Sequence, residues 1–318
     1  ELEGTLHLWN GYGWGPIAVT AWDYTPGPGF IFGGETYGYA TGVNRQDQFA
    51  FASDGDATQV GVQFAAAAGG AGQSSSVNGY LSGGGWAIGT PGNVIQKWPF
   101  ASGGDMTDVG DLSISVVWPG GNSSPENGYT SGGWASTGFL INNIQKFPFA
   151  SDANATDAGD LYIDMGQHGS QNTAEYGYAS VGRNSEADSG ARRTNVISKF
   201  AYASDGNSTN VGSVAVNTER TSGQSSIENG YVSGGHTQPG VIYKFSFASD
   251  GVATIIGSPF DVNKKQRAGI SSRNHGYAAG GTTPIIDSIE KFSFTTDGNG
   301  TDVGNLTQTR ADLAGQQV

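Results

Sequence analysis

The chain has 318 residues, of which 53 are glycine, and it carries a formal net charge of −13 with only 15 lysines and arginines. So few cations exclude a basic stripe, and we expect neither a nucleic-acid partner nor binding to an anionic membrane. The absence of cysteine excludes disulfides and thiolate metal sites, and no apolar run approaches the length of a membrane span.

Residues 1–34 are predicted to form an N-terminal hairpin arm, because apolar and polar residues alternate on both sides of a turn signal. The alternating positions are Leu6, His7, Leu8 and Trp9 before Asn10-Gly11, and Trp14, Ile17 and Val19 after it. We expect Trp9 and Trp14 to dock on a larger assembly. The alternative is a strand pair that packs on the rim of the main domain. Because Glu1 is not preceded by Met, we expect a processed product or part of something longer.

From residue 35 onward a repeat organises the chain. A Gly-Tyr step recurs six times, with its tyrosines 41, 49, 49, 53 and 46 residues apart; they are Tyr39, Tyr80, Tyr129, Tyr178, Tyr231 and Tyr277. This is the period of one four-stranded propeller blade, and no stretch carries the 3.6-residue apolar spacing of a helix. Residues 35–318 are therefore predicted to form an all-β, six-bladed β-propeller.

One repeat illustrates the expected strands. In "VIYKFSF", Ile242, Lys244 and Ser246 face one way and the aromatic residues between them face the other. "ASDG" then turns, "ATIIG" begins the next strand, and the double glycine after each Gly-Tyr step allows close approach of neighbouring backbones.

The last residues are predicted to close the ring. Aligning 314–318 with 71–75 places Val318 on Ser75, and Glu35 then corresponds to Ser76. The wrapped spacing from Tyr277 to Tyr39 becomes 46 residues, in line with the other repeats. The C-terminal strand should therefore complete the blade that the N-terminal repeat opens.

This pattern resembles the kelch repeat. The resemblance rests on the double glycine in "SGGH" and "AGGT", the later aromatic in "YKFSF" and "EKFSF", and an arginine before the next strand (Arg220, Arg267 or Arg310). The chain departs from kelch blades because "AT-x-VG" stands where they usually carry a tryptophan. The resemblance implies a propeller with the first strand of each repeat innermost, and it implies no single activity.

A second resemblance concerns biology. Residues 4–14 contain the segment "G-x-L-x-x-W-x-G-x-x-W", which is similar to segments of virion structural proteins of marine bacteriophages. The "FASDG"-type repeats are also similar to repeats in proteins of such phages.

No catalytic pattern accompanies the repeats. The four histidines are His7, His168, His236 and His275, and none has an evident paired carboxylate or nucleophilic serine motif. The copper site of galactose oxidase, a kelch-type enzyme, uses a cysteine that this chain lacks. The oxygen-rich turns that begin at Asp152, Asp205 and Asp297 favour Asx turns over calcium. We therefore expect no enzyme activity, no cofactor and no metal.

Five lysines recur in register: Lys97, Lys146, Lys199, Lys244 and Lys291. A ligand site would rarely repeat in five blades, so we interpret them as scaffold residues that reach a carboxylate or the rim. Asp111 and Asp160 are candidate partners.

Residues outside the repeat pattern are where binding can vary. They gather after the double glycines and before the next Gly-Tyr step. The candidate glycan-binding residues among them are Trp86, Trp118, Trp134, Arg192, Arg193 and His236. Exposed tryptophan beside polar side chains suits sugar stacking and hydroxyl hydrogen bonds. The alternative is that these tryptophans cap blade edges or contact a neighbouring subunit.

The sequence therefore predicts a non-enzymatic phage virion structural or display protein, such as a tail fibre, an appendage or a capsid decoration. It would be located on the virion or outside the cell. Its expected partners are other virion proteins, copies of itself and host-surface glycans. The alternative is a secreted bacterial propeller that binds or processes polysaccharide.

Overall fold

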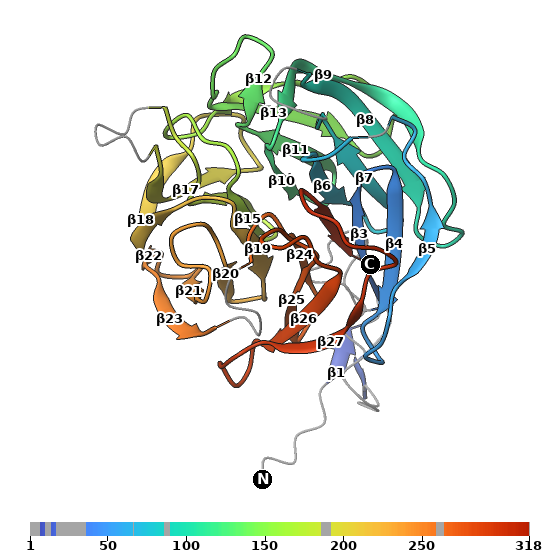
Figure 1. Cartoon of the computed structure of the whole chain (residues 1–318), viewed down its shortest axis with the longest axis vertical. Coiled ribbons are helices and arrows are strands. Elements are labelled where there is room, and N and C mark those ends of the chain that lie inside the picture. Colours follow the sequence, from blue (N-terminus) through green and yellow to red (C-terminus); the bar gives the residue numbers. More distant parts are fainter. Residues whose placement is uncertain are drawn as a thin grey trace.

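The computed structural model describes residues 7–9, 14–16, 36–65, 67–85, 90–185, 192–258 and 264–317. Six antiparallel sheets of four or five strands surround a central axis and form a six-bladed β-propeller (Figure 1). The described residues contain no helix that is long and apolar enough to cross a membrane. The predicted all-β class and the blade count are confirmed.

The two inner strands of each blade come from the residues around the Gly-Tyr step. The innermost strands are β28 (Ala314–Gln317), β6 (Ala71–Ser74), β10 (Gly120–Ser123), β15 (Gly169–Asn172), β19 (Ser222–Ser225) and β24 (Ala268–Ser271). The second strands are β3 (Tyr37–Gly42), β7 (Asn78–Ser82), β11 (Asn127–Ser131), β16 (Tyr176–Ser180), β20 (Asn229–Ser233) and β25 (His275–Ala279).

The two outer strands follow in each repeat. The third strands are β4 (Arg45–Ala50), β8 (Gly92–Pro99), β13 (Asn143–Pro148), β17 (Thr194–Ala201), β21 (Ile242–Ser246) and β26 (Ser288–Ser293). The fourth strands are β5 (Thr58–Gly61), β9 (Thr107–Val117), β14 (Thr156–Asp160), β18 (Thr209–Thr218), β23 (Thr254–Gly257) and β27 (Thr301–Asn305). Two blades gain a fifth strand, β12 (Trp134–Ala135) on β9 and β22 (Gly251–Val252) on β18.

The Gly-Tyr step has a packing explanation. Gly79 lies under the ring of Trp98 on the third strand, and a Cβ at this glycine would stand 2.2 Å from that ring. The tyrosine that follows packs outward: Tyr80 stacks on Phe149 of the next blade with 4.7 Å between ring centroids. The glycine therefore serves packing within a blade and the tyrosine serves packing between blades. The same glycine contact recurs at Gly128, Gly177, Gly230 and Gly276.

The predicted ring closure is confirmed. Strand β28 pairs with β3 so that Gln316 faces Tyr39, as Gln73 faces Tyr80 in the next blade. The Gln316 side chain then donates a 3.0 Å hydrogen bond to the carbonyl oxygen of Tyr80. Figure 1 shows the C-terminus beside β3 and β4. The two ends of the propeller chain therefore meet in one blade.

The phased lysines join neighbouring blades. Each Nζ reaches the aspartate of the "ASDG"-type turn in the following blade, and the pairs are Lys97–Asp152, Lys146–Asp205, Lys199–Asp250, Lys244–Asp297 and Lys291–Asp54. Asp111 and Asp160 are not the partners, because each lysine points to the turn of the next blade. The sixth boundary has Gln48 in place of the lysine and Gly103 in place of the aspartate.

The oxygen-rich turns also bind the neighbouring blade. The side-chain oxygens of Asn154, Asn207 and Asn299 accept hydrogen bonds from backbone N–H groups of Asp111, Asp160 and Ser258, each at 3.0 Å. No group of three or more metal-binding side chains is found in the described ranges.

The arm contributes a short hairpin. Strands β1 (His7–Trp9) and β2 (Trp14–Pro16) are antiparallel, and Trp9 pairs with Trp14. The predicted hairpin is confirmed for these residues. Ile17 and Val19 lie outside the described residues.

Candidate functional site

Both sets of loops outside the repeat pattern lie at one end of the propeller. In a four-stranded antiparallel blade, the connection from the second strand to the third and the connection to the next blade leave from the same end. We call this end the loop face. The opposite end, which carries the hairpin turns and the "ASDG"-type turns, is the turn face.

At the loop face, six residues form a ring around the propeller axis. Each lies two residues before the first residue of an innermost strand, and each has φ between +55° and +62°. We call them the mouth ring: Gly69, Trp118, Gln167, Arg220, Gln266 and Asp312. Each backbone N–H donates to the carbonyl oxygen of the ring residue in the preceding blade, at 2.7 to 3.1 Å. These six hydrogen bonds close on themselves.

The positive φ of the mouth-ring residues makes it unusual that five of them carry side chains. Glycine is the least strained residue in this conformation, and Gly69 shows that the ring accepts it. The other five positions carry side chains despite the strain, and a bulky residue such as Trp118 is rare there. These side chains therefore require a reason other than the backbone geometry.

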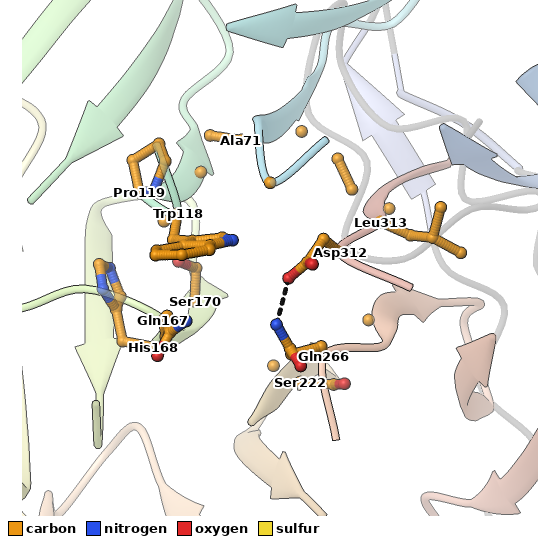
Figure 2. A pocket seen from close by; sticks show the side chains of 18 of the residues that line it. Ala71, Trp118, Pro119, Gln167, His168, Ser170, Ser222, Gln266, Asp312 and Leu313 are labelled. Atoms are coloured by element: carbon orange, nitrogen blue, oxygen red, sulfur yellow. Dashed lines mark hydrogen bonds between the residues drawn. The ribbon is translucent and has the colours of Figure 1, made fainter. Parts of the chain in front are cut away.

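The mouth ring opens into a cavity on the propeller axis, with a volume of about 130 Å³. Figure 2 shows Trp118, Gln167 and His168 on one side of it and Asp312 with Gln266 on the other. Pockets that enclose a whole small molecule usually measure ~300–1,000 Å³. The cavity therefore suits one terminal group of a ligand, with the remainder lying on the loop face.

Three buried polar atoms, which belong to residues that line this cavity, have no hydrogen-bond partner in the structure. They are Gln167 Nε2, His168 Nδ1 and Ser170 Oγ. Gln167 and His168 are 8% and 7% exposed, and burial lowers the pKa of His168 to about 4, so its ring is neutral at pH 7. An unpartnered buried polar atom is costly. A ligand that donates and accepts hydrogen bonds could satisfy these three atoms.

The opposite wall is already paired. The Gln266 side chain donates a 2.5 Å hydrogen bond to Asp312. Burial raises the pKa of Asp312, while Gln266, the charge of Arg220 and Trp118 oppose that shift. The indole of Trp118 lies over Gly69, where a Cβ would stand 2.3 Å from the ring. Because Gly69 has no side chain, the indole can occupy this space.

The sequence-predicted residues divide into groups. Trp118 lies at the mouth, whereas Trp134 belongs to the edge strand β12. The guanidinium of Arg183 lies 5.6 Å from the ring centroid of Trp134. Arg193 and His236 meet around Glu219 beside the mouth. Arg192 is exposed in the same loop. Trp86 lies outside the described residues.

Sequence reasoning missed most of the mouth. It did not select Gln167, Ser170, Gln266 or Asp312, and it set His168 aside. Arg220, Arg267 and Arg310 each precede an innermost strand, as expected, but they do so at different positions. Only Arg220 is in the mouth ring, and the other two form buried ion pairs with Glu290 and Asp47. Each ring residue lies four positions before the third residue of its innermost strand, so counting back from that residue would have found the ring in the sequence.

The sequence matches no protein-family model and no curated protein.

Proposed function

We propose that this chain is a non-enzymatic binding and display module that takes a saccharide at the mouth of the propeller. One observation carries the proposal: five strained mouth-ring positions keep side chains around a cavity, and three of the residues that line it each have an unpartnered buried polar atom. Strain retained at a site where glycine would fit supports a binding role.

A saccharide fits the chemistry of this wall. Sugar hydroxyls both donate and accept hydrogen bonds, and the free atoms of Gln167, His168 and Ser170 offer both possibilities. The half-buried indole of Trp118 adds an aromatic surface against which a sugar ring can pack. The small cavity suits a terminal sugar unit of a longer chain.

The same lining favours binding over hydrolysis. Most glycoside hydrolases use two carboxyl groups that flank the bond to be broken. Among the described residues that line the cavity, Asp312 is the only carboxylate, and it is bound to Gln266.

The setting that we propose is a bacteriophage virion. Two resemblances support it: residues 4–14 are similar to segments of marine phage virion proteins, and the "FASDG"-type repeats are similar to repeats in proteins of such phages. The arm, with Trp9 and Trp14, would dock on other virion proteins or on copies of the chain, and the loop face would point toward host glycans. A secreted bacterial propeller that binds or processes polysaccharide is the alternative.

A glycan array with the full chain tests the binding role. The wild type should bind a discrete set of glycans, and Trp118→Ala and Gln167→Ala should lose that set while retaining the wild-type melting temperature. Tyr37→Ala, which removes a partly exposed aromatic at the turn face, should bind as the wild type does. An array without hits would contradict the binding role. Immunogold labelling of purified phage particles with an antibody to the propeller would test the setting.

A further inference from the structure

The cations of this acidic chain are unevenly placed. The five phased lysines are paired at the turn face, and Arg267 and Arg310 are buried in ion pairs. On the loop face, by contrast, four basic residues lie together beside the mouth. We call them the basic cluster: Arg193, Arg220, His236 and Lys265.

The basic cluster surrounds one buried carboxylate. Glu219 is 5% exposed, and its Oε1 lies 3.3 Å from Arg193 Nε and 3.9 Å from Arg220 Nε. Lys265 Nζ lies 3.2 Å from His236 Nδ1, and the backbone N–H of His236 donates to the Glu219 carbonyl at 2.9 Å. Two permanent cations, Arg193 and Arg220, therefore share one close carboxylate, and Lys265 joins them through its contact with His236.

The same three cations act on His236. Burial lowers the pKa of His236, and the charges of Arg193, Lys265 and Arg220 lower it further, while Glu219 only partly opposes them. The imidazole is thereby kept neutral, and its Nδ1 can accept a hydrogen bond from Lys265. Asp312 also interacts with Arg220, but it lies on the cavity side and is bound to Gln266.

The basic cluster is continuous with the cavity. Arg220 belongs to the mouth ring, and its Nε donates a 3.4 Å hydrogen bond to Gln167 Oε1. Arg193 and Lys265 are only partly buried, and both lie on the loop face. A ligand seated at the mouth would therefore present its next substituent to these cations.

We infer that the saccharide is acidic, and that its carboxylate or sulfate group is bound by Arg193 and Lys265 with support from Arg220. This inference rests on the proposed binding function. Guanidinium groups bind such oxyanions with paired, charge-assisted hydrogen bonds. A local positive site on a protein of net charge −13 would also discriminate against neutral sugars, because only an anionic group gains from it.

The test compares matched saccharides by calorimetry with the full chain. The probes are an oligogalacturonate with its carboxyl-reduced counterpart, and a sulfated galactan oligosaccharide with its desulfated counterpart. The wild type should bind one acidic member at least about tenfold more tightly than its neutral counterpart. Raising NaCl from about 50 to 500 mM should reduce the difference in affinity between the acidic and the neutral saccharide, because salt screens exposed charges.

Two variants complete the test. The double variant Arg193→Gln/Lys265→Gln should lose at least about tenfold in affinity for the acidic member and keep its affinity for the neutral one. Arg273→Gln is the matched control, because Arg273 is an exposed arginine in the turn between β24 and β25 at the turn face. It should bind both members as the wild type does. Melting temperatures confirm that the variants fold.

The outcomes separate this inference from the proposed function. Equal wild-type affinity for acidic and neutral members would overturn the acidic specificity and leave saccharide binding intact. Absence of binding to every saccharide would overturn both. An equal loss in Arg273→Gln would show that general charge, not the basic cluster, holds the ligand, and would also overturn the inference.

Discussion

Lys291 Nζ lies 2.6 and 2.8 Å from the two carboxylate oxygens of Asp54, although 237 residues separate them in the chain. This ion pair crosses the boundary between the last blade and the first. It repeats the contact that the other four phased lysines make at their own boundaries. The closing boundary is therefore built by the same rule as the internal ones.

The ion pair itself should contribute little to stability. Both side chains are partly exposed, at 21% and 50%, and exposed pairs are worth about 0.2–1 kcal/mol. A double-mutant cycle with Lys291→Gln and Asp54→Asn, read by urea unfolding, should give a coupling energy in that range that falls with added salt. A coupling energy of several kcal/mol would contradict this.

Backbone contact near the axis should matter far more. A Cβ at Gly315 would stand 2.1 Å from the carbonyl oxygen of Gly269 in the neighbouring blade. We expect Gly315→Ala to lower the free energy of unfolding by about 1–3 kcal/mol, because neither backbone can move without disturbing the ring. Chemical denaturation measures the change.

Gly206 provides the matched control. It lies in an "ASDG"-type turn, its φ is not in the left-handed region, and a Cβ there would meet nothing within 4 Å. Gly206→Ala should change the free energy of unfolding by no more than about 0.5 kcal/mol. Equal effects of the two substitutions would show that close packing of the innermost strands is unimportant.

Residue spacing was sufficient to predict the propeller, because the packing rules repeat. Gly79 must lie under Trp98 and Tyr80 must reach Phe149, so each blade repeats these residue types at the same spacing. The closing strand was predictable for the same reason, since Gln316 repeats the role of Gln73.

The site was harder to predict because its rule concerns the backbone alone. The mouth ring shares φ and a hydrogen-bond pattern, yet Trp118, Arg220 and Asp312 have no side-chain chemistry in common. No residue type therefore repeats to mark the ring. Likewise, the contact of Arg193 with Glu219 joins two loops of variable length, which no period relates.

Removing the last nine residues should destabilise the propeller. The deletion removes β28 and Arg310, and with them the Gln316 contact to Tyr80 and the buried ion pair with Asp47. It also opens the six-membered mouth ring at Asp312. We expect the melting temperature to fall by at least about 5 °C, since several kcal/mol are lost. Unchanged melting would contradict the closure.

A circular permutant tests the closure without removing contacts. Val318 corresponds to Ser75 and Glu35 to Ser76, so joining Val318 directly to Glu35 should recreate the hairpin turn of the other blades. With residues 1–34 omitted and new ends between 258 and 264, the chain should fold with a melting temperature within about 5 °C of the wild type. Failure of this permutant to fold, with the wild type intact, would argue against the inferred turn.

Acid should destabilise the protein through His168. Its imidazole is buried with a pKa of about 4, whereas an unfolded histidine has a pKa near 6.5. In this pH range the unfolded state therefore binds a proton that the folded state does not bind, and the free energy of unfolding falls as the pH drops from about 6.5 to 4. Between pH 7 and pH 5 the titration of this histidine should lower the free energy of unfolding by about 2 kcal/mol.

His168→Gln, which cannot titrate, should lose that part of the pH dependence in urea unfolding. His275→Asn is the control, because this half-exposed position carries asparagine in three other blades, and it should change the pH dependence less. If His168→Gln and the wild type lose equal stability between pH 7 and pH 5, the histidine is not the cause.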